Sequence, residues 1–448
     1  MDRRHQTWAT SGRFVPKTFV QPFVQFTRIE ASSGIVLLAA AAAGLILANS
    51  AWSETYFEIL ATHLTVELGG FHFDETVLDL VNDGLMAVFF YVVGLEIKRQ
   101  LVLGDLRDRR VAAVPVVAAL GGMALPALIY LTLTLGEGGE AVRGWGIPMA
   151  TDIAFALGVL ALLGPRVPPA AKVFLLALAI ADDIGAITVI AVFYTEDLDL
   201  GYLTLALAGL AAVWVASRVH IRSLAFYVPA ALVIWYFTLE SGVHATLAGV
   251  ALGFLTPATR MYTPAEFDFR ARAILDSYPS DVDDPESRER ADHEAILLSQ
   301  VSTEAVSPLS RVEHALQAWS SFLVIPLFAL ANAGVDFRGF DLSESAPNVA
   351  LGVAAGLIIG KTVGISLFTF AAVRLGLGPL PAGTSWPQVI GLGAVGGIGF
   401  TVSLFVAGLA FTDPGLLDLA KIGVFAGSIL AGIIGWVILS RVEGPARG

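Results

Sequence analysis

Long apolar runs alternate with short polar connections along almost the whole chain. An α-helix needs roughly 20 residues to cross about 30 Å of hydrocarbon, and twelve runs approach that length. The predicted segments are 32–50, 77–97, 112–135, 147–163, 171–193, 200–217, 223–238, 242–256, 316–335, 348–373, 388–411 and 418–440. The pattern therefore predicts an all-α polytopic membrane protein with about 12 transmembrane helices.

Lysine and arginine are unevenly distributed among the connections between these segments. If both termini are cytoplasmic, 23 of the 27 basic residues lie in cytoplasmic segments, and only Arg143 and Arg338 lie in opposite connections. Basic residues gather on the cytoplasmic side, so the asymmetry predicts an even number of spans in this orientation. The expected organisation is a cytoplasmic tail (1–31), spans one to eight (32–256), an acidic cytoplasmic loop (257–315), spans nine to twelve (316–440) and a cytoplasmic C-terminal tail (441–448).

One long polar insertion separates the eighth and ninth segments. Residues 257–314 contain twelve acidic residues and six arginines. The run 281–286 is typical of disordered chain, and 287–301 has the pattern of a short amphipathic helix. We expect a solvated loop here rather than a regulatory domain.

Composition narrows the class of function. The chain is 56% hydrophobic and 15% charged, whereas soluble domains are about 25% charged. It has no cysteine, which excludes disulfides and thiolate chemistry, and its net charge of −12 argues against nucleic acid as a partner. No zinc-protease, nucleophile-elbow or phosphate-loop motif occurs, so we expect neither an enzyme nor a cofactor.

Two adjacent acids, Asp182 and Asp183, interrupt the otherwise apolar stretch 173–193. A carboxylate at the centre of a spanning helix costs about 2.5–3.5 kcal/mol, so a pair is expected to face a partner or a water-filled cavity. A structural ion pair is one interpretation. We favour an ion or proton pathway, because two adjacent acids point about 100° apart and need more than one partner.

Further candidate functional residues lie in or near segments whose residues interrupt a continuous helix. Pro148 and nearby glycines interrupt the fourth segment just before Thr151 and Asp152, and a glycine-rich run, 391–399, interrupts the eleventh. Glycine-rich spans also occur as plain close-packed helices. Breaks at comparable places in two halves are nevertheless typical of a secondary transporter's binding site, where Asp152 could compensate helix N-termini and Lys361, in the tenth segment, helix C-termini.

Other ionisable residues lie nearer the ends of the segments. Asp83 and Glu96 flank the apolar run 84–95, which predicts Asp83 in the outer third of the membrane and Glu96 at its cytoplasmic edge. A plain interfacial charge explains Glu96 equally well. His244 begins the eighth segment, where a hydrogen-bonded packing residue is a simpler interpretation than a proton carrier.

Several stretches resemble the NhaA family of sodium/proton antiporters. They occur in the family's order and cover nearly the whole chain outside the tail and the acidic insertion. The stretches are Val81-Asn-Asp-Gly-Leu-Met-Ala-Val-Phe-Phe-Tyr-Val-Val-Gly-Leu-Glu-Ile-Lys-Arg99, 150–164, Leu178-Ala-Ile-Ala-Asp-Asp-Ile-Gly-Ala186, Ser241-Gly-Val-His-Ala-Thr-Leu-Ala-Gly249 and Gly397-Ile-Gly-Phe-Thr401. The resemblance implies inverted repeats and two broken helices that cross near the bilayer midplane.

The resemblance also implies roles for individual residues. Asp182, Asp183 and Thr151 would take protons or the transported Na⁺, with Lys361 pairing with Asp182 when sodium is absent. Asp152 and Lys361 would compensate charge at the broken helices, and Asp83 would line the outer approach. The implied pH-response candidates are Glu96, Lys98, Arg99, Glu313, His314 and His244. Gln100 and Gln317 replace an acid and a histidine expected in the family, which puts the pH set point in doubt.

The function implied is exchange of cytoplasmic Na⁺, and of Li⁺, for external H⁺ by alternating access in a bacterial inner membrane, electrogenic and regulated by pH. Lipid is the expected surrounding, and the choice between a monomer and a homodimer stays open. Two other functions are weighed. A sodium-coupled symporter for an organic solute would need a roomier pocket, and an intramembrane aspartyl protease would need two acids on facing helices, which adjacent acids and a lysine do not suit.

Overall fold

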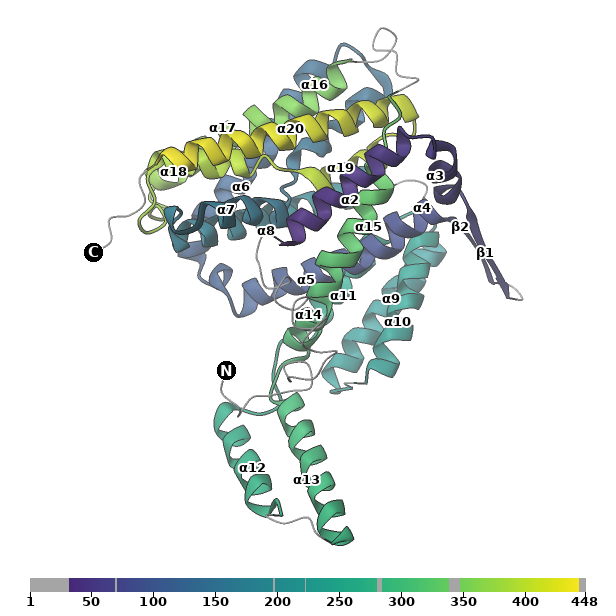
Figure 1. Ribbon diagram of the computed structural model, residues 1–448, viewed down its shortest axis with the longest axis vertical. Helices are drawn as coiled ribbons and strands as arrows, with labels where there is room; N and C mark the ends of the chain where they lie inside the picture. Colours follow the sequence, from purple (N-terminus) through teal and green to yellow (C-terminus); the bar gives the residue numbers. More distant parts are fainter. Residues whose placement is uncertain are drawn as a thin grey trace.

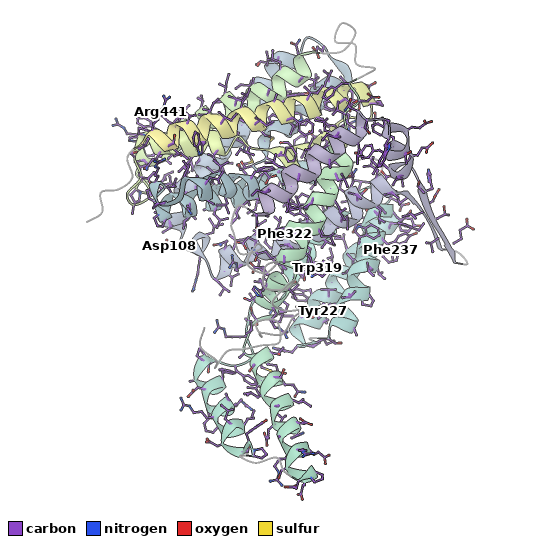
Figure 2. All side chains as sticks on the ribbon, in the orientation of Figure 1. Asp108, Tyr227, Phe237, Trp319, Phe322 and Arg441 are labelled. Carbon is purple, nitrogen blue, oxygen red and sulfur yellow. The ribbon has the colours of Figure 1, made fainter. Side chains whose placement is uncertain are left out.

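The computed structural model describes residues 32–68, 71–195, 198–221, 223–279, 284–337 and 347–442. The predicted N-terminal tail and most of the predicted C-terminal tail lie outside these ranges. Figure 1 shows a body of packed helices, from which a separate pair of helices, α12 and α13, projects at one end. Figure 2 shows that the side chains of these two helices project outward, with little of the body packed around them.

Each of the twelve predicted segments coincides with a helix or with helical pieces in sequence, which confirms the predicted fold class. Seven helices in the described ranges are long and apolar enough to cross a membrane, or up to ten if each of three bent pairs is one span. Two shorter apolar helices, α10 and α11, complete the set. The unbroken elements are α2 (Ser32–Ala48), α6 (Arg109–Thr134), α8 (Pro169–Phe193), α9 (Leu200–Arg218), α10 (Leu224–Glu240), α11 (Thr246–Leu255) and α20 (Pro414–Arg441).

The remaining spans are built from shorter pieces. Three contain a π-helical turn, which widens the helix locally and often marks a functional site. These spans are α4 (Val77–Asp79) with η4 (Leu80–Leu85) and α5 (Met86–Val102), α14 (Pro308–Trp319) with η8 (Ser320–Val324) and α15 (Ile325–Asn332), and α16 (Pro347–Ala355) with η9 (Gly356–Gly360) and α17 (Lys361–Arg374). The ninth span therefore begins at Pro308, eight residues before the predicted boundary at 316, because Ser307 caps a helix there.

Two spans are broken rather than merely widened. The 3₁₀-helical η6 (Gly139–Met149) meets α7 (Ile153–Leu163) at 42°, and α18 (Trp386–Val395) meets α19 (Phe400–Ala410) at 48°. Pro148 and the run of glycines before Phe400 lack the donors or the side chains that keep a helix continuous. Both breaks were predicted from these residues.

Close backbone contact between α6 and α17 holds Lys361 in the interior of the helix bundle. A Cβ atom built on Gly121 would collide with the carbonyl oxygen of Gly364, so only glycine permits this approach. Gly122 faces the stem of Lys361 at the same contact. The lysine is thereby held inside the body, one turn from the point where two helices touch.

The segment between the first two spans was not predicted to be structured. It contains α3 (Ser53–Leu60) and the antiparallel strands β1 (His63–Leu68) and β2 (Phe71–Thr76), paired from His63 with Thr76 to Leu68 with Phe71. The strands alternate apolar and polar residues around Gly69-Gly70, which is a hairpin signal in the sequence. The predicted all-α class thus needs one two-stranded sheet added to it.

The acidic insertion is more ordered than predicted. It forms a hairpin of two helices, α12 (Pro264–Ser277) and α13 (Pro285–Glu304), where only a helix over 287–301 was expected. Thr263 and Asp284 cap their N-termini, so the end of the supposedly disordered run 281–286 is a helix cap. Residues 281–283 lie outside the described ranges.

Candidate functional site

The two broken spans touch at their breaks. The backbone N–H of Asp152 donates to the carbonyl of Ile398 at 2.6 Å, and the Ser403 hydroxyl donates to the carbonyl of Ile147 at 2.7 Å. Each break exposes backbone groups that an intact helix would use itself, and the other break satisfies them. The contact brings residues about 250 positions apart into one buried site.

Asp152 bonds to the N-termini of both half-helices that start at this contact. Its Oδ1 accepts from the N–H of Phe155 in α7, and its Oδ2 accepts from the N–H and the hydroxyl of Thr401 in α19, at 3.1, 3.1 and 2.6 Å. The N-terminus of a helix carries a partial positive charge of roughly half a unit. Two such ends converge on one buried carboxylate, which is 3% exposed.

Lys361 reaches Asp182 in the same region. Its Nζ lies 2.5 Å from Asp182 Oδ2 and 3.0 Å from Thr151 Oγ1, and both charged side chains are fully buried. The Thr151 hydroxyl lies 2.8 Å from Asp182 Oδ2 and 2.7 Å from the carbonyl of Gly396. Because a hydroxyl has one proton, Thr151 can donate to only one of these oxygens at a time.

Asp183 has a different environment from its neighbour. It is 5% exposed, and it makes no hydrogen bond or ion pair among the residues that the structure describes. Oδ1 of Asp182 is also buried without a hydrogen-bond donor in those ranges. A buried carboxylate oxygen without a donor is costly unless it is protonated or meets a cation. The site thus offers oxygen atoms that either a proton or a metal ion such as Na⁺ could satisfy.

A second charged group lies on α5 and α14. Arg99 donates from Nη2 to both carboxylate oxygens of Glu96 at 2.8 Å, and Gln100 donates to Glu96 at 3.0 Å. The Arg99 guanidinium also forms an ion pair with Glu313, with Nε 3.1 Å from Oε1. Ile97, which follows Glu96 on α5, belongs to the same buried apolar cluster as Ile180 of α8. This charged group is therefore connected by packing to the helix that carries Asp182.

A family model and several relatives identify the family of this chain. A family model described as Na⁺/H⁺ antiporter 1 matches residues 24–439. The chain is 45% identical over 432 residues to the Na(+)/H(+) antiporter NhaA of Rhodopirellula baltica, covering 96% of each chain. It is 46% identical to that of Koribacter versatilis, covering 95% of this chain and 92% of the relative, and 47% identical to that of an Anaeromyxobacter species, covering 94% and 91%.

The chain belongs to the Na⁺/H⁺ antiporter 1 family. This is the family that the motifs around Asp83, Thr151, Asp182 and His244 predicted, so the resemblance is confirmed. The structure brings Thr151, Asp182 and Lys361 together and joins Asp152 to the same crossing.

Two of the pH-response candidates, Lys98 and His314, make no hydrogen bond or ion pair to the Glu96 group among the described residues of the antiporter. Lys98 donates to the carbonyls of Phe254 and Thr256 at 2.7 and 2.5 Å, so it caps the C-terminus of α11 instead. His314 is exposed on α14, next to the buried Glu313.

His244 lies at the opposite end of the α5–α11 helix pair from the Glu96 group. Helices α5 and α11 run in the same direction, since Gly249 contacts Ala87 near their starts and Lys98 bonds to Thr256 near their ends. His244 precedes α11, and its Nε2 lies 2.7 Å from the carbonyl of Tyr194. The structure therefore does not bring His244 to the group with which it was predicted to respond.

Asp83 lies on the π-helical turn η4. Its backbone carbonyl accepts from Trp235 at 2.9 Å, and the adjacent Asn82 accepts from Asn332 at 2.7 Å. Its surroundings are acidic. Burial raises the pKa of Glu75, on β2, above its ordinary value, and the nearby carboxylates of Asp79 and Glu240 raise that pKa further.

Sequence reasoning missed several contributors to the crossing. Thr401 and Ser403 donate hydroxyl protons across it, and the carbonyls of Gly396 and Ile398 accept. Thr401 lies two residues after the last glycine of the break, where an N-terminal helix position is expected, so the pattern did contain a signal for it. Backbone acceptors leave no signal in the sequence.

Proposed function

We propose that this protein exchanges Na⁺ for H⁺ by alternating access, with Asp182 and Asp183 as the site at which the two cations compete. Family membership makes it a secondary transporter whose ions are substrates, not cofactors. The observation that carries the site assignment is the buried Lys361–Asp182 pair at the helix crossing, next to a second buried carboxylate. Charges at this depth are expensive and are typical of ion pathways.

Competition follows from the chemistry of the oxygens. Na⁺ needs several oxygen ligands, at least one of them anionic, and a proton on the same carboxylate removes that ligand. Asp182, Asp183 and Thr151 supply the oxygens. For Na⁺ to bind at Asp182 Oδ2, Lys361 must withdraw, because two cations next to one oxygen repel each other.

The number of ionisable groups favours electrogenic exchange. When Na⁺ enters, Asp183 can release one proton and Lys361 or Asp182 another. Two protons moving inward for each Na⁺ moving outward would carry one net positive charge into the cell. Alternating exposure of a fixed site would then let the inward proton gradient drive Na⁺ out of the cell.

Asp152 and Asp83 receive supporting roles in this proposal. Asp152 holds the two half-helices together by neutralising their positive ends, while Lys361 offsets the opposite ends of the crossing. Asp83 lines the outer approach. The Glu96–Arg99–Glu313 group, with Lys98, His314 and His244 as further candidates, adjusts activity to pH.

Orientation and partners are also part of the proposal. The distribution of basic residues supports an orientation with both termini in the cytoplasm, and we place the protein in a bacterial inner membrane. Li⁺ carries the same charge as Na⁺ and prefers the same oxygen ligands, so we expect it to be transported too. Light scattering in detergent distinguishes a monomer from a homodimer.

The direct test uses purified protein in proteoliposomes that hold a proton gradient. Added Na⁺ should dissipate the gradient, and an opposing membrane potential should slow the exchange if it is electrogenic. A sodium/solute symporter would leave the proton gradient intact and would accumulate an organic solute instead. Such a result would remove the proposed function.

Removal of the α12–α13 hairpin should leave maximal exchange nearly intact. Deletion of 266–303 preserves the base of the hairpin, where Met261 N–H donates to Glu304 and Leu309 N–H donates to Pro257, at 3.1 and 3.0 Å. It removes no residue of the helix crossing. Initial rates in proteoliposomes provide the measurement. Complete loss of exchange in a correctly inserted deletion variant would mean that the hairpin belongs to the transport machinery.

The two glutamines should limit the response to pH. Gln100 donates to Glu96, and Gln317 is exposed one turn after Glu313, yet neither side chain titrates. The double variant Gln100→Glu, Gln317→His adds groups that ionise near pH 4 and about 6.5. We expect its activity to rise more steeply with pH, or over a displaced range. If the profiles of the variant and the parent overlay, the response arises at Asp182 and Asp183 alone.

A further inference from the structure

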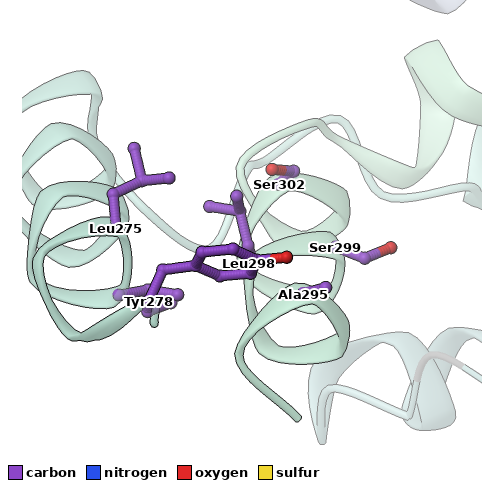
Figure 3. Close-up of a pocket in the computed structure, with 7 residues that line it drawn as sticks. Leu275, Tyr278, Ala295, Leu298, Ser299 and Ser302 are labelled. Carbon is purple, nitrogen blue, oxygen red and sulfur yellow. The ribbon is translucent and has the colours of Figure 1, made fainter. Parts of the chain in front are cut away.

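The α12–α13 hairpin carries an apolar groove of about 410 Å³ on its surface. Ile274 and Leu275 of α12 and Tyr278, directly after it, line one side, and Ala295 and Leu298 of α13 line the other. Figure 3 shows Tyr278 reaching across toward Leu298. Leu275 is 56% exposed and Tyr278 46% exposed, so the groove offers apolar surface that nothing in the described ranges covers.

Negative charge surrounds this groove. The described residues of 264–304 include nine acidic side chains and four arginines. Two of the arginines are engaged within the hairpin, Arg272 with Asp268 and Arg290 with Glu286. Hydrogen bonds from Thr263 lower the pKa of Glu266, and those from Ser287 lower the pKa of Asp284, so both carboxylates stay charged at neutral pH.

Helix α2 begins at its end nearer the hairpin. Asn49, just after α2, bonds to the carbonyl of Val335 just after α15, and Gly44 of α2 contacts Leu330 of α15. Helices α2 and α15 therefore run in the same direction. Since α15 continues η8 and α14, which start at the hairpin, Ser32 faces the hairpin end.

The chain before Ser32 is rich in basic and aromatic residues, which are complementary to an apolar groove with an acidic rim. Residues 1–31 contain five basic residues, two acids and five aromatic side chains. The basic residues are Arg3, Arg4, Arg13, Lys17 and Arg28, and the aromatic residues are Trp8, Phe14, Phe19, Phe23 and Phe26. We propose that this N-terminal tail docks on the α12–α13 groove of its own chain, with aromatic side chains in the apolar groove and basic side chains against its acidic rim.

The tether is long enough for this contact. A chain of 31 residues spans about 100 Å when extended, whereas α14, which separates the body from the hairpin, is about 18 Å long. Two sites joined by a linker of such length meet at about millimolar effective concentration. At this concentration the tail occupies the groove even if its intrinsic affinity is weak.

Cross-linking in the full-length protein tests the contact. The sequence has no cysteine, so two introduced thiols are the only ones present. Ser299→Cys, at the groove, is combined in turn with Trp8→Cys, Phe14→Cys or Phe19→Cys and treated with a short bifunctional reagent. At least one pair should cross-link within a single chain in inner-membrane vesicles. The yield should fall about tenfold when Leu275→Ser removes apolar surface from the groove.

Two matched variants separate the groove from general effects. Phe269→Ser changes a side chain of α12 that is 75% exposed and outside the groove, so it should leave the yield unchanged. Arg13→Glu alters only the tail and should lower the yield, and added salt should weaken the contact.

Several results would overturn the proposal. They are no cross-link at any tail position, a yield that neither Leu275→Ser nor Arg13→Glu alters, and cross-links only between two singly substituted chains, which would assign the groove to a second copy. Loss of the cross-link in vesicles rich in anionic phospholipid, with retention in detergent, would place the tail on the membrane surface instead.

Discussion

Replacing Asp183 with asparagine is expected to abolish exchange while leaving the protein folded and inserted. Asparagine has nearly the same shape and cannot carry the negative charge that a desolvated Na⁺ requires. The loss of one member of a buried charged contact costs about 2–5 kcal/mol, so apparent Na⁺ affinity should fall about 30-fold to several thousandfold. Na⁺-driven proton movement in proteoliposomes measures the effect.

A control for this substitution is available on the hairpin. Asp268→Asn removes an exposed acid whose ion pair with Arg272 lies outside the helix crossing. It should leave exchange unchanged. Wild-type exchange in Asp183→Asn would remove Asp183 from the ion site. An Asp183→Asn protein that melts well below the parent would point to a structural role.

Replacing Lys361 with alanine is expected to lower stability and to displace the pH dependence of exchange. The substitution leaves Asp182 buried and deprives it of its cation at 2.5 Å. Breaking one side of a buried ion pair costs about 3–5 kcal/mol, which corresponds to a fall in melting temperature of roughly 3–5 °C for a chain of this length. Thermal unfolding in detergent and the pH profile of exchange provide the two readings.

Two further variants isolate the charge from the packing. Lys361→Met retains most of the stem that packs near Gly122, and it should destabilise nearly as much as alanine if the charge is decisive. Adding Asp182→Asn to Lys361→Met removes both charges and should recover part of the lost stability. If the double variant is as unstable as the sum of the single variants, Asp182 and Lys361 do not interact energetically.

Much of the fold follows from the sequence because apolar runs and helix breakers are local signals. The twelve segments, the break at Pro148 and the glycine-rich break before Phe400 all lie where the residues predicted them. Other elements were missed. The Gly69-Gly70 signal between alternating residues was present but lay in a segment treated as a connection, and α12 was hidden in a strongly charged insertion.

The site was only partly accessible to sequence reasoning. Asp182, Asp183 and Lys361 stand out because charges are rare at membrane depth. Their partners do not, because Thr151 and Thr401 are ordinary residues until two distant breaks meet. The separation of Lys98 from Arg99 depends on which face of α5 each side chain occupies, since one bonds to α11 and the other to α14. No single segment contains that information.

Competition between Na⁺ and H⁺ for the same carboxylates is the central claim, and Na⁺ binding measured across pH tests it most directly. Titration calorimetry on the purified protein gives an apparent Kd for Na⁺ at each pH. Competition predicts that this Kd rises about tenfold for each unit by which the pH falls, per proton displaced, and that Asp183→Asn lowers this dependence by one proton. If the parent protein binds Na⁺ with a Kd that stays constant with pH, Na⁺ and H⁺ do not share a site.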